Sequence, residues 1–132
     1  MNTENKTKLE MSSESLEWLI EQKIKYLQEE LTEEHLWEVI VVCQHKEFVT
    51  FSGLPFTYEL RKGKRGEYTK ELWIDRREKS KSLAWSSVRL AFEKVKNGKI
   101  TVERPKALGD IRGISYIYAL FLKFGLIEAA ET

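Results

Sequence analysis

Nine Lys and Arg side chains within residues 61–81 are the feature of this sequence best suited to ligand chemistry. One group surrounds a glycine-containing turn, and the other follows the next apolar run. Long cationic side chains on a protruding ribbon suit contact with nucleic-acid phosphates, because binding releases counterions. We therefore predict a surface that binds DNA or RNA, made by Arg61, Lys62, Lys64, Arg65, Lys70, Arg76, Arg77, Lys79 and Lys81.

Other residues of the same segment both support and weaken this prediction. Four carboxylates lower its charge balance to +5. Trp73 and Trp85 flank the basic residues and would either stack on a base or belong to the core. Ser80 and Ser82 are expected at a helix start, where backbone amides bind oxyanions. The alternative interpretation is a solvated surface that carries charges of both signs.

Residues 106–113 form a second candidate site, for an anion. Two glycines and an arginine precede an apolar helix, so that backbone amides and a cation would converge on a phosphate. The alternative is a glycine-permitted turn in which Asp110 caps the helix and Arg112 is solvated. An enzyme acting on a phosphorylated substrate would need Lys106, Arg112 and a carboxylate in one pocket. The predicted anion-binding residues are Lys106, Gly109, Arg112 and Gly113.

Residues suited to catalysis are few. Cys43 and His45 lie close in sequence, but a zinc site needs three or four ligands. We find no phosphate loop, no dinucleotide-binding motif and no nucleophile elbow. A metal-dependent nuclease needs acidic residues at a strand end with a lysine nearby, to hold a divalent cation. Residues of these types occur at Asp75, Glu78, Lys79 and Lys81, but their spacing fits no nuclease motif. The sequence thus favours a non-enzymatic protein, with no predicted catalytic residue, metal site or cofactor.

The charge is distributed unevenly along the chain. Residues 1–47 hold eleven Glu and five Lys, whereas residues 61–123 hold seventeen Lys or Arg and seven acids. Such asymmetry indicates a polyanion-facing surface in the basic half. The alternative function is a protein-interaction module, in which residues 13–46 dock a partner or a second copy. Its aromatic anchors would be Trp18, Tyr26 and Trp37.

The first half of the chain predicts a tail and two helices. Residues 1–11 are polar and without periodicity, which predicts a disordered N-terminal tail. Apolar residues at helical spacing then predict helices at about 13–30 and 33–46. Serines at the start of the first helix and Thr32 before the second are suitable N-caps.

The second half predicts a small antiparallel sheet and two further helices. Alternating apolar residues predict a β-hairpin from residues 56–60 and 72–74, with Gly63 and Gly66 in its turn. A helix capped by Ser80 or Ser82 and ended by Gly98 should follow. A short strand near residue 100 and a final helix from Asp110 or Ile111 to Lys123 complete the order. Residues 12–128 are therefore predicted to form one α+β domain with two helices on each side of the hairpin.

Composition indicates the compartment in which the protein is expected. The chain has 132 residues, a net charge of +1 and one cysteine, which favours a reducing compartment. No apolar run reaches the length of about 18 to 20 residues that spans a bilayer. We therefore expect a cytoplasmic protein without a membrane partner.

Four segments carry a resemblance to known proteins. They are residues 51–58, 77–83, 104–109 and 113–118. This pattern resembles a family of small uncharacterised proteins of Gram-positive bacteria, and the resemblance covers residues 48–127. It implies a bacterial cytoplasmic protein, and it implies no activity, cofactor or mechanism.

Overall fold

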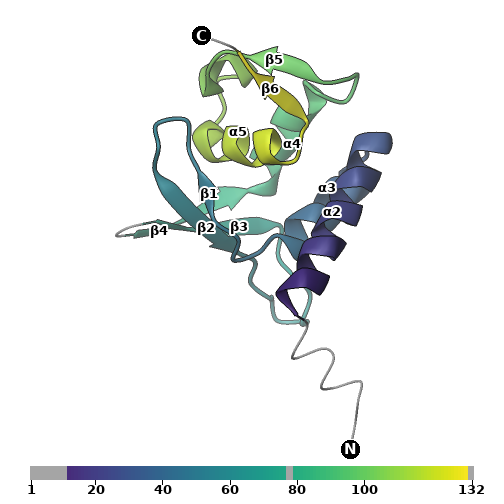
Figure 1. The fold of residues 1–132 in the computed structure, drawn as a ribbon. Coiled ribbons are helices and arrows are strands. Elements are labelled where there is room, and N and C mark those ends of the chain that lie inside the picture. Colours follow the sequence, from purple (N-terminus) through teal and green to yellow (C-terminus); the bar gives the residue numbers. More distant parts are fainter. Residues whose placement is uncertain (1–11, 77–78, 131–132) are drawn as a thin grey trace, which may run out of the picture.

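The computed structural model describes residues 12–76 and 79–130. The predicted α+β class, with two helices, a small antiparallel sheet and two further helices, is confirmed (Figure 1). The predicted tail 1–11 and Arg77 lie outside the described residues. The elements are α2 (Ser13–Glu29), α3 (Glu33–Val42), β1 (Phe48–Val49), β2 (Pro55–Glu59), β3 (Glu71–Arg76), β4 (Lys79–Ala84), α4 (Trp85–Glu93), β5 (Ile100–Val102), the 3-10 helix η1 (Pro105–Leu108), α5 (Ile114–Lys123) and β6 (Ile127–Ala129).

The two N-terminal helices begin where capping chemistry predicts. The Ser12 side chain accepts a hydrogen bond from the Ser15 amide, and Thr32 accepts one from the His35 amide. The prediction that the second helix continues to residue 46 is wrong, because α3 ends at Val42. His45 has a φ of 67°, and this left-handed conformation is incompatible with a continued α-helix.

The hairpin prediction is confirmed by the register of the sheet. The four strands lie in the order β1-β2-β3-β4, and Tyr58 of β2 pairs with Ile74 of β3. Both of these side chains are buried, so one face of the sheet belongs to the core. The Tyr58 hydroxyl donates to the Ile40 carbonyl of α3, and Phe56 packs edge-on against Tyr116 of α5. Helices α3 and α5 therefore cover this face.

The prediction that Ser80 or Ser82 caps a helix is wrong, because residues 79–84 form strand β4. This strand pairs antiparallel with β3, so that Leu83 lies opposite Leu72 in the core. Pairing satisfies the hydrogen-bonding groups that β3 would otherwise expose, and this tertiary gain outweighs the local capping preference. Helix α4 begins only at Trp85, and β4 becomes an edge of the sheet.

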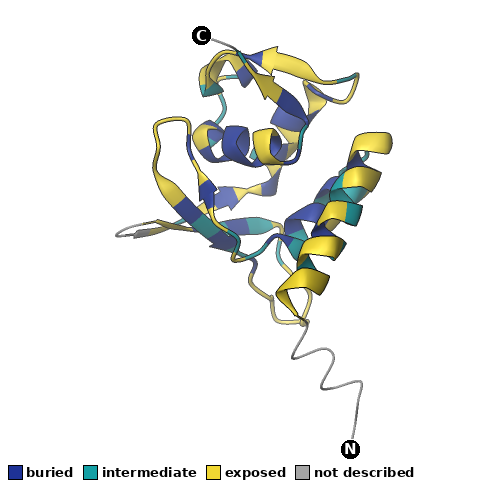
Figure 2. Ribbon diagram, viewed as in Figure 1, coloured by how far each residue is buried: buried dark blue, intermediate teal, exposed yellow. Residues whose placement is uncertain are grey.

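The C-terminal elements form a second small layer above the sheet (Figure 1). The predicted strand at residue 100 is confirmed as β5, and it pairs in parallel with β6, which was not predicted. Asp110 is not the helix cap, since α5 follows Gly113. Most of α5 is buried, whereas α2 exposes one side to solvent (Figure 2). No helix in the described ranges is long and apolar enough to cross a membrane.

Candidate nucleic-acid interface

Strand β3 separates the predicted nucleic-acid-binding residues into two groups. Five of them, from Arg61 to Lys70, precede the strand. Arg76 is its last residue, and Lys79 and Lys81 lie on β4 opposite Arg76 and Ile74. The two ends of this six-residue strand are about 17 Å apart at the usual rise per residue. We call residues 61–70 the loop end. The cleft end comprises Arg76, Lys81, Arg112 and the other residues that line the cleft described next.

The cleft end surrounds a cleft of about 320 Å³ between β4 and the starts of α4 and α5. Lys81 comes from β4, and Arg112 immediately precedes Gly113, the N-cap residue of α5. Among the described residues that line it, none is acidic, so positive charge is not neutralised at its wall. The lining consists of Ile74, Lys81, Ser82, Leu83, Ala84, Ser87, Arg112, Gly113 and Tyr116.

Gly113 allows the two cations to share this cleft. Its φ of 77° is a left-handed conformation that glycine adopts without a steric cost. A Cβ atom at this position would lie 2.4 Å from Cδ1 of Leu83, so only glycine lets the chain pass this close to β4. The close approach brings Arg112 to the same cleft as Lys81.

Polar groups around the two cations add to the affinity for an anion. Ser87 lines the cleft with its hydroxyl-bearing side chain, whereas Ser82 pairs with Trp73, so that its side chain lies on the outer face of the sheet. The first turns of α4 and α5 border the cleft, so the positive ends of both helix dipoles lie near it. No side chain caps either helix start. The cleft therefore combines two full positive charges with hydrogen-bond donors, which is the chemistry that binds phosphate.

Arg76 is tied to the same region through Tyr116. Its Nη1 donates a hydrogen bond of 2.7 Å to the Tyr116 hydroxyl, and Tyr116 lines the cleft. Side chains alternate along a strand, so Arg76 projects to the same face of β3 as Ile74. Lys79 pairs with Arg76 through the backbone, and its side chain lies outside the described part of the chain.

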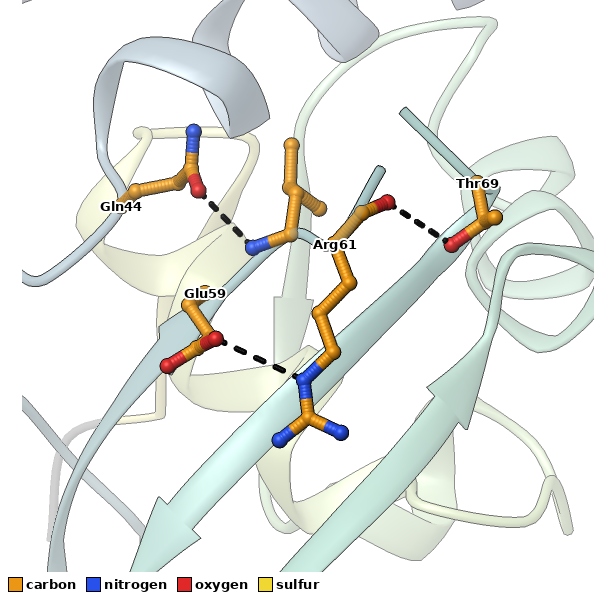
Figure 3. A network of polar contacts seen from close by, with 5 residues as sticks. Gln44, Glu59, Arg61 and Thr69 are labelled. Carbon is orange, nitrogen blue, oxygen red and sulfur yellow. Dashed lines mark hydrogen bonds and ion pairs between the residues drawn. The ribbon is translucent and has the colours of Figure 1, made fainter. Parts of the chain in front are cut away.

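At the loop end, Arg61 is held by the protein itself (Figure 3). Its Nε lies 3.5 Å from a carboxylate oxygen of Glu59, and its guanidinium lies 4.0 Å above the Trp73 ring. The backbone around it is also fixed, because the Leu60 amide donates to Gln44 and the Arg61 carbonyl accepts from Thr69. Arg61 thus already contacts a carboxylate and an aromatic ring of the protein.

Two further loop-end lysines lie over aromatic rings. The Lys62 ammonium is 5.6 Å from the centre of the Tyr68 ring. The Lys70 ammonium is 3.6 Å from the centre of the Trp37 ring and 5.4 Å from that of Trp85. Partial burial lowers the pKa of Lys70, and the nearby Glu33 carboxylate opposes this shift. Both lysines therefore already contact aromatic side chains of the fold.

Lys64 and Arg65 complete the loop end. Both are exposed, and neither forms an ion pair with another described residue. They project from the turn around Gly66, whose φ is 81°. The loop end therefore presents two uncommitted cations to solvent on a turn, whereas the cleft end presents its cations around a concavity.

The two tryptophans predicted to stack on a base have different surroundings. Trp85 is only 5% exposed and packs edge-on against Trp37, so the core interpretation of Trp85 is confirmed. Trp73 is half-buried, and Arg61 covers one face of its ring. A base can reach neither ring without displacing a contact that the fold already makes.

The predicted anion site at residues 106–113 is divided by the fold. Arg112 and Gly113 belong to the cleft, but Lys106 and Gly109 do not line it. Gly109 lies against Ile111, at a φ of 140°. The pocket of Lys106, Arg112 and a carboxylate, which would favour an enzyme, does not form among the described residues.

The groups considered for catalysis are not arranged for it. Burial raises the pKa of the Cys43 thiol to about 12, so the nucleophilic thiolate scarcely forms at neutral pH. Asp75 and Lys81 occupy opposite faces of the sheet, and Glu78 lies outside the described residues. The described residues contain no group of three or more His, Cys, Asp or Glu that could hold a metal ion.

Sequence reasoning missed Ser87 and Tyr116 as residues of the site. Ser87 lies in the first turn of α4, a helix that we had predicted to begin earlier. Tyr116 is 7% exposed, so its burial alone does not distinguish it from the other core residues of α5. Only the contact of its hydroxyl with Arg76, forty positions away, reveals its role.

Comparison with protein-family models, with curated proteins and with solved structures finds no match to this chain. The functional assignment therefore depends on the geometry and charge of the cleft end.

Proposed function

We propose that this protein is a non-enzymatic binder of DNA or RNA that contacts the phosphate backbone through its cleft end. The observation that carries the proposal is the meeting of Lys81 and Arg112 in one cleft with no acidic residue among its described lining. Cations from distant parts of the chain converge there, which a mixed-charge solvated surface does not require. The expected setting is the cytoplasm of a bacterium.

The proposed binding mode follows from the side chains of the cleft. Phosphate oxygens accept hydrogen bonds from the Arg112 guanidinium and the Lys81 ammonium, with the hydroxyl of Ser87 as a further donor. Arg76, held by Tyr116, extends the positive charge along the strand. These contacts bind the phosphate backbone and do not distinguish one base from another. We therefore expect the affinity to depend little on nucleotide sequence.

The same lining argues for binding rather than catalysis. Its polar side chains are two cations, the Ser87 hydroxyl and a tyrosine. The lining includes no histidine and no carboxylate, the side chains that most often act as general bases in hydrolysis or proton transfer. The cleft can hold and orient a phosphate without activating a nucleophile.

The test is the salt dependence of affinity for short DNA and RNA strands, measured by fluorescence anisotropy. Displacement of counterions predicts that affinity falls by orders of magnitude between about 50 and 200 mM salt if several phosphates are contacted. Strands of different sequence should bind similarly. Absence of binding to DNA and RNA at low salt would contradict the proposal.

A protein-interaction function through α2 is a second candidate, because two predicted anchors are exposed. Trp18 is 61% exposed and Tyr26 is 49% exposed, whereas Trp37 packs against Trp85. Glu14, Ser15 and Leu19 line a shallow hollow beside Trp18. If the protein self-associates through this face, the mass measured by sedimentation should rise with protein concentration. The W18A variant should instead have the mass of a monomer. A monomer at every concentration would exclude that form.

A further inference from the structure

We infer that the cleft end binds the terminal phosphate monoester of a nucleic-acid strand in preference to an internal phosphodiester. This inference rests on the proposed function and specifies which phosphate enters the cleft. It follows from the charge of the cleft and from its shape.

The charge of the cleft suits a dianion better than a monoanion. Lys81 and Arg112 bring two positive charges, and no described lining residue brings a negative one. A phosphodiester carries one negative charge, whereas a phosphate monoester carries about 1.5 to 2 at neutral pH, because its second pKa is about 6. The monoester also offers three terminal oxygens, so the guanidinium, the ammonium and a serine hydroxyl can each bind its own acceptor.

The shape of the cleft suits the end of a strand. Its walls come from three elements, namely β4, the start of α4 and the segment that leads into α5. An internal phosphate is flanked by a nucleoside on each side, and both must leave the site. A terminal phosphate needs only one exit. The volume of the cleft is about 320 Å³, at the lower limit of small-molecule sites. This space suits a terminal phosphate together with part of the sugar to which it is attached.

The loop end differs from the cleft end in shape. Lys64 and Arg65 are exposed on a convex turn, where a phosphate monoester and a phosphodiester meet similar surroundings. Preference for a strand end should therefore depend on the cleft and be indifferent to the loop. This difference supplies a matched control for the experiment.

The experiment compares one short single strand in three forms: with a 5′-phosphate, with a 3′-phosphate and with hydroxyls at both ends. Affinities are measured by competition at fixed salt, with a mononucleoside monophosphate as a further competitor. One additional charge-assisted contact predicts that a terminal phosphate tightens binding about tenfold relative to the unphosphorylated strand. The preference should shrink as the pH falls below about 6, where the monoester becomes a monoanion.

Two variants test whether the preference arises in the cleft. R112Q and K81Q should each remove most of the preference for the phosphorylated strand, whereas K64Q should leave the ratio of affinities unchanged. All three variants lose one charge, and thermal unfolding verifies that each is folded. Competition by the mononucleotide would show that the cleft recognises the monoester itself, without help from the rest of the strand.

The outcomes separate the inference from the proposed function. Equal affinities for phosphorylated and unphosphorylated strands would overturn the inference and leave backbone binding intact. A preference that survives in R112Q and K81Q would also overturn it, since the phosphate would then bind elsewhere. Failure of every strand to bind at low salt would overturn both.

Discussion

At the loop end, Arg61 and Lys70 lie over tryptophan rings of the protein itself, whereas at the cleft end Lys81 and Arg112 line a concavity. Both groups were part of basic segments in the sequence, and both contain the same residue types. The number of cations in a segment therefore does not measure its capacity to bind an anion. A cation that lies on a ring can still donate hydrogen bonds, so the two ends differ mainly in whether their cations border a concavity or project from a turn.

Glycine substitutions at the two ends should show the largest difference. Gly113 and Gly66 both have a positive φ, but an added Cβ would strike Leu83 only at Gly113. We expect G66A to lower the free energy of unfolding by about 1 kcal/mol, through backbone strain alone. G113A should lower it by about 3 kcal/mol, because steric overlap in the core adds to that strain. Chemical denaturation measures both, and equal losses would show that the approach to β4 is not close.

Removal of one tyrosine hydroxyl at each end should show a smaller difference. Y116F deletes the acceptor of the Arg76 hydrogen bond, whereas the loop-end contact of Tyr68 with Lys62 involves its ring. We expect Y116F to lower stability by about 1 kcal/mol, the usual worth of such a bond. Y68F keeps the ring and should have almost no effect. A neutral Y116F would mean that Tyr116 does not hold Arg76 in solution.

Titration of Lys70 should show the smallest effect. Partial burial beside Trp37 lowers the pKa of Lys70 in the folded protein, so Lys70 should lose its proton at a lower pH than an ordinary lysine. Since the pKa is lower in the folded than in the unfolded chain, protonation of Lys70 favours unfolding. Its contribution to stability therefore rises as the pH approaches the ordinary lysine value and is lost as the pH falls. NMR titration of the Lys70 side chain checks this, and an ordinary lysine pKa would contradict its partial burial.

Much of the fold could be predicted because its signals are local. The caps at Ser12 and Thr32 and the alternation of apolar residues in β2 and β3 depend on neighbouring residues. Strand β4 could not be predicted from Ser80 and Ser82, since their sequence suits a helix start. It becomes a strand because β3 offers it a partner.

The site was predicted in pieces for the same reason. Lys81 and Arg112 were both named as anion-binding residues, but in two separate sites. Their meeting depends on the close packing of Gly113 against Leu83, which no local pattern records. The contact of Arg61 with Trp73 could not be predicted either, because it joins the segment after β2 to strand β3 across the outer face of the sheet.

The most direct test of the account compares two double variants that lose the same charge, K81Q/R112Q at the cleft end and K64Q/R65Q at the loop end. Affinity for a short nucleic-acid strand is measured for each across a salt series. We expect K81Q/R112Q to lose about tenfold or more in affinity and to lower the salt slope by about 2, with a clearly smaller loss for K64Q/R65Q. An equal or greater loss in K64Q/R65Q would contradict the assignment of binding to the cleft end.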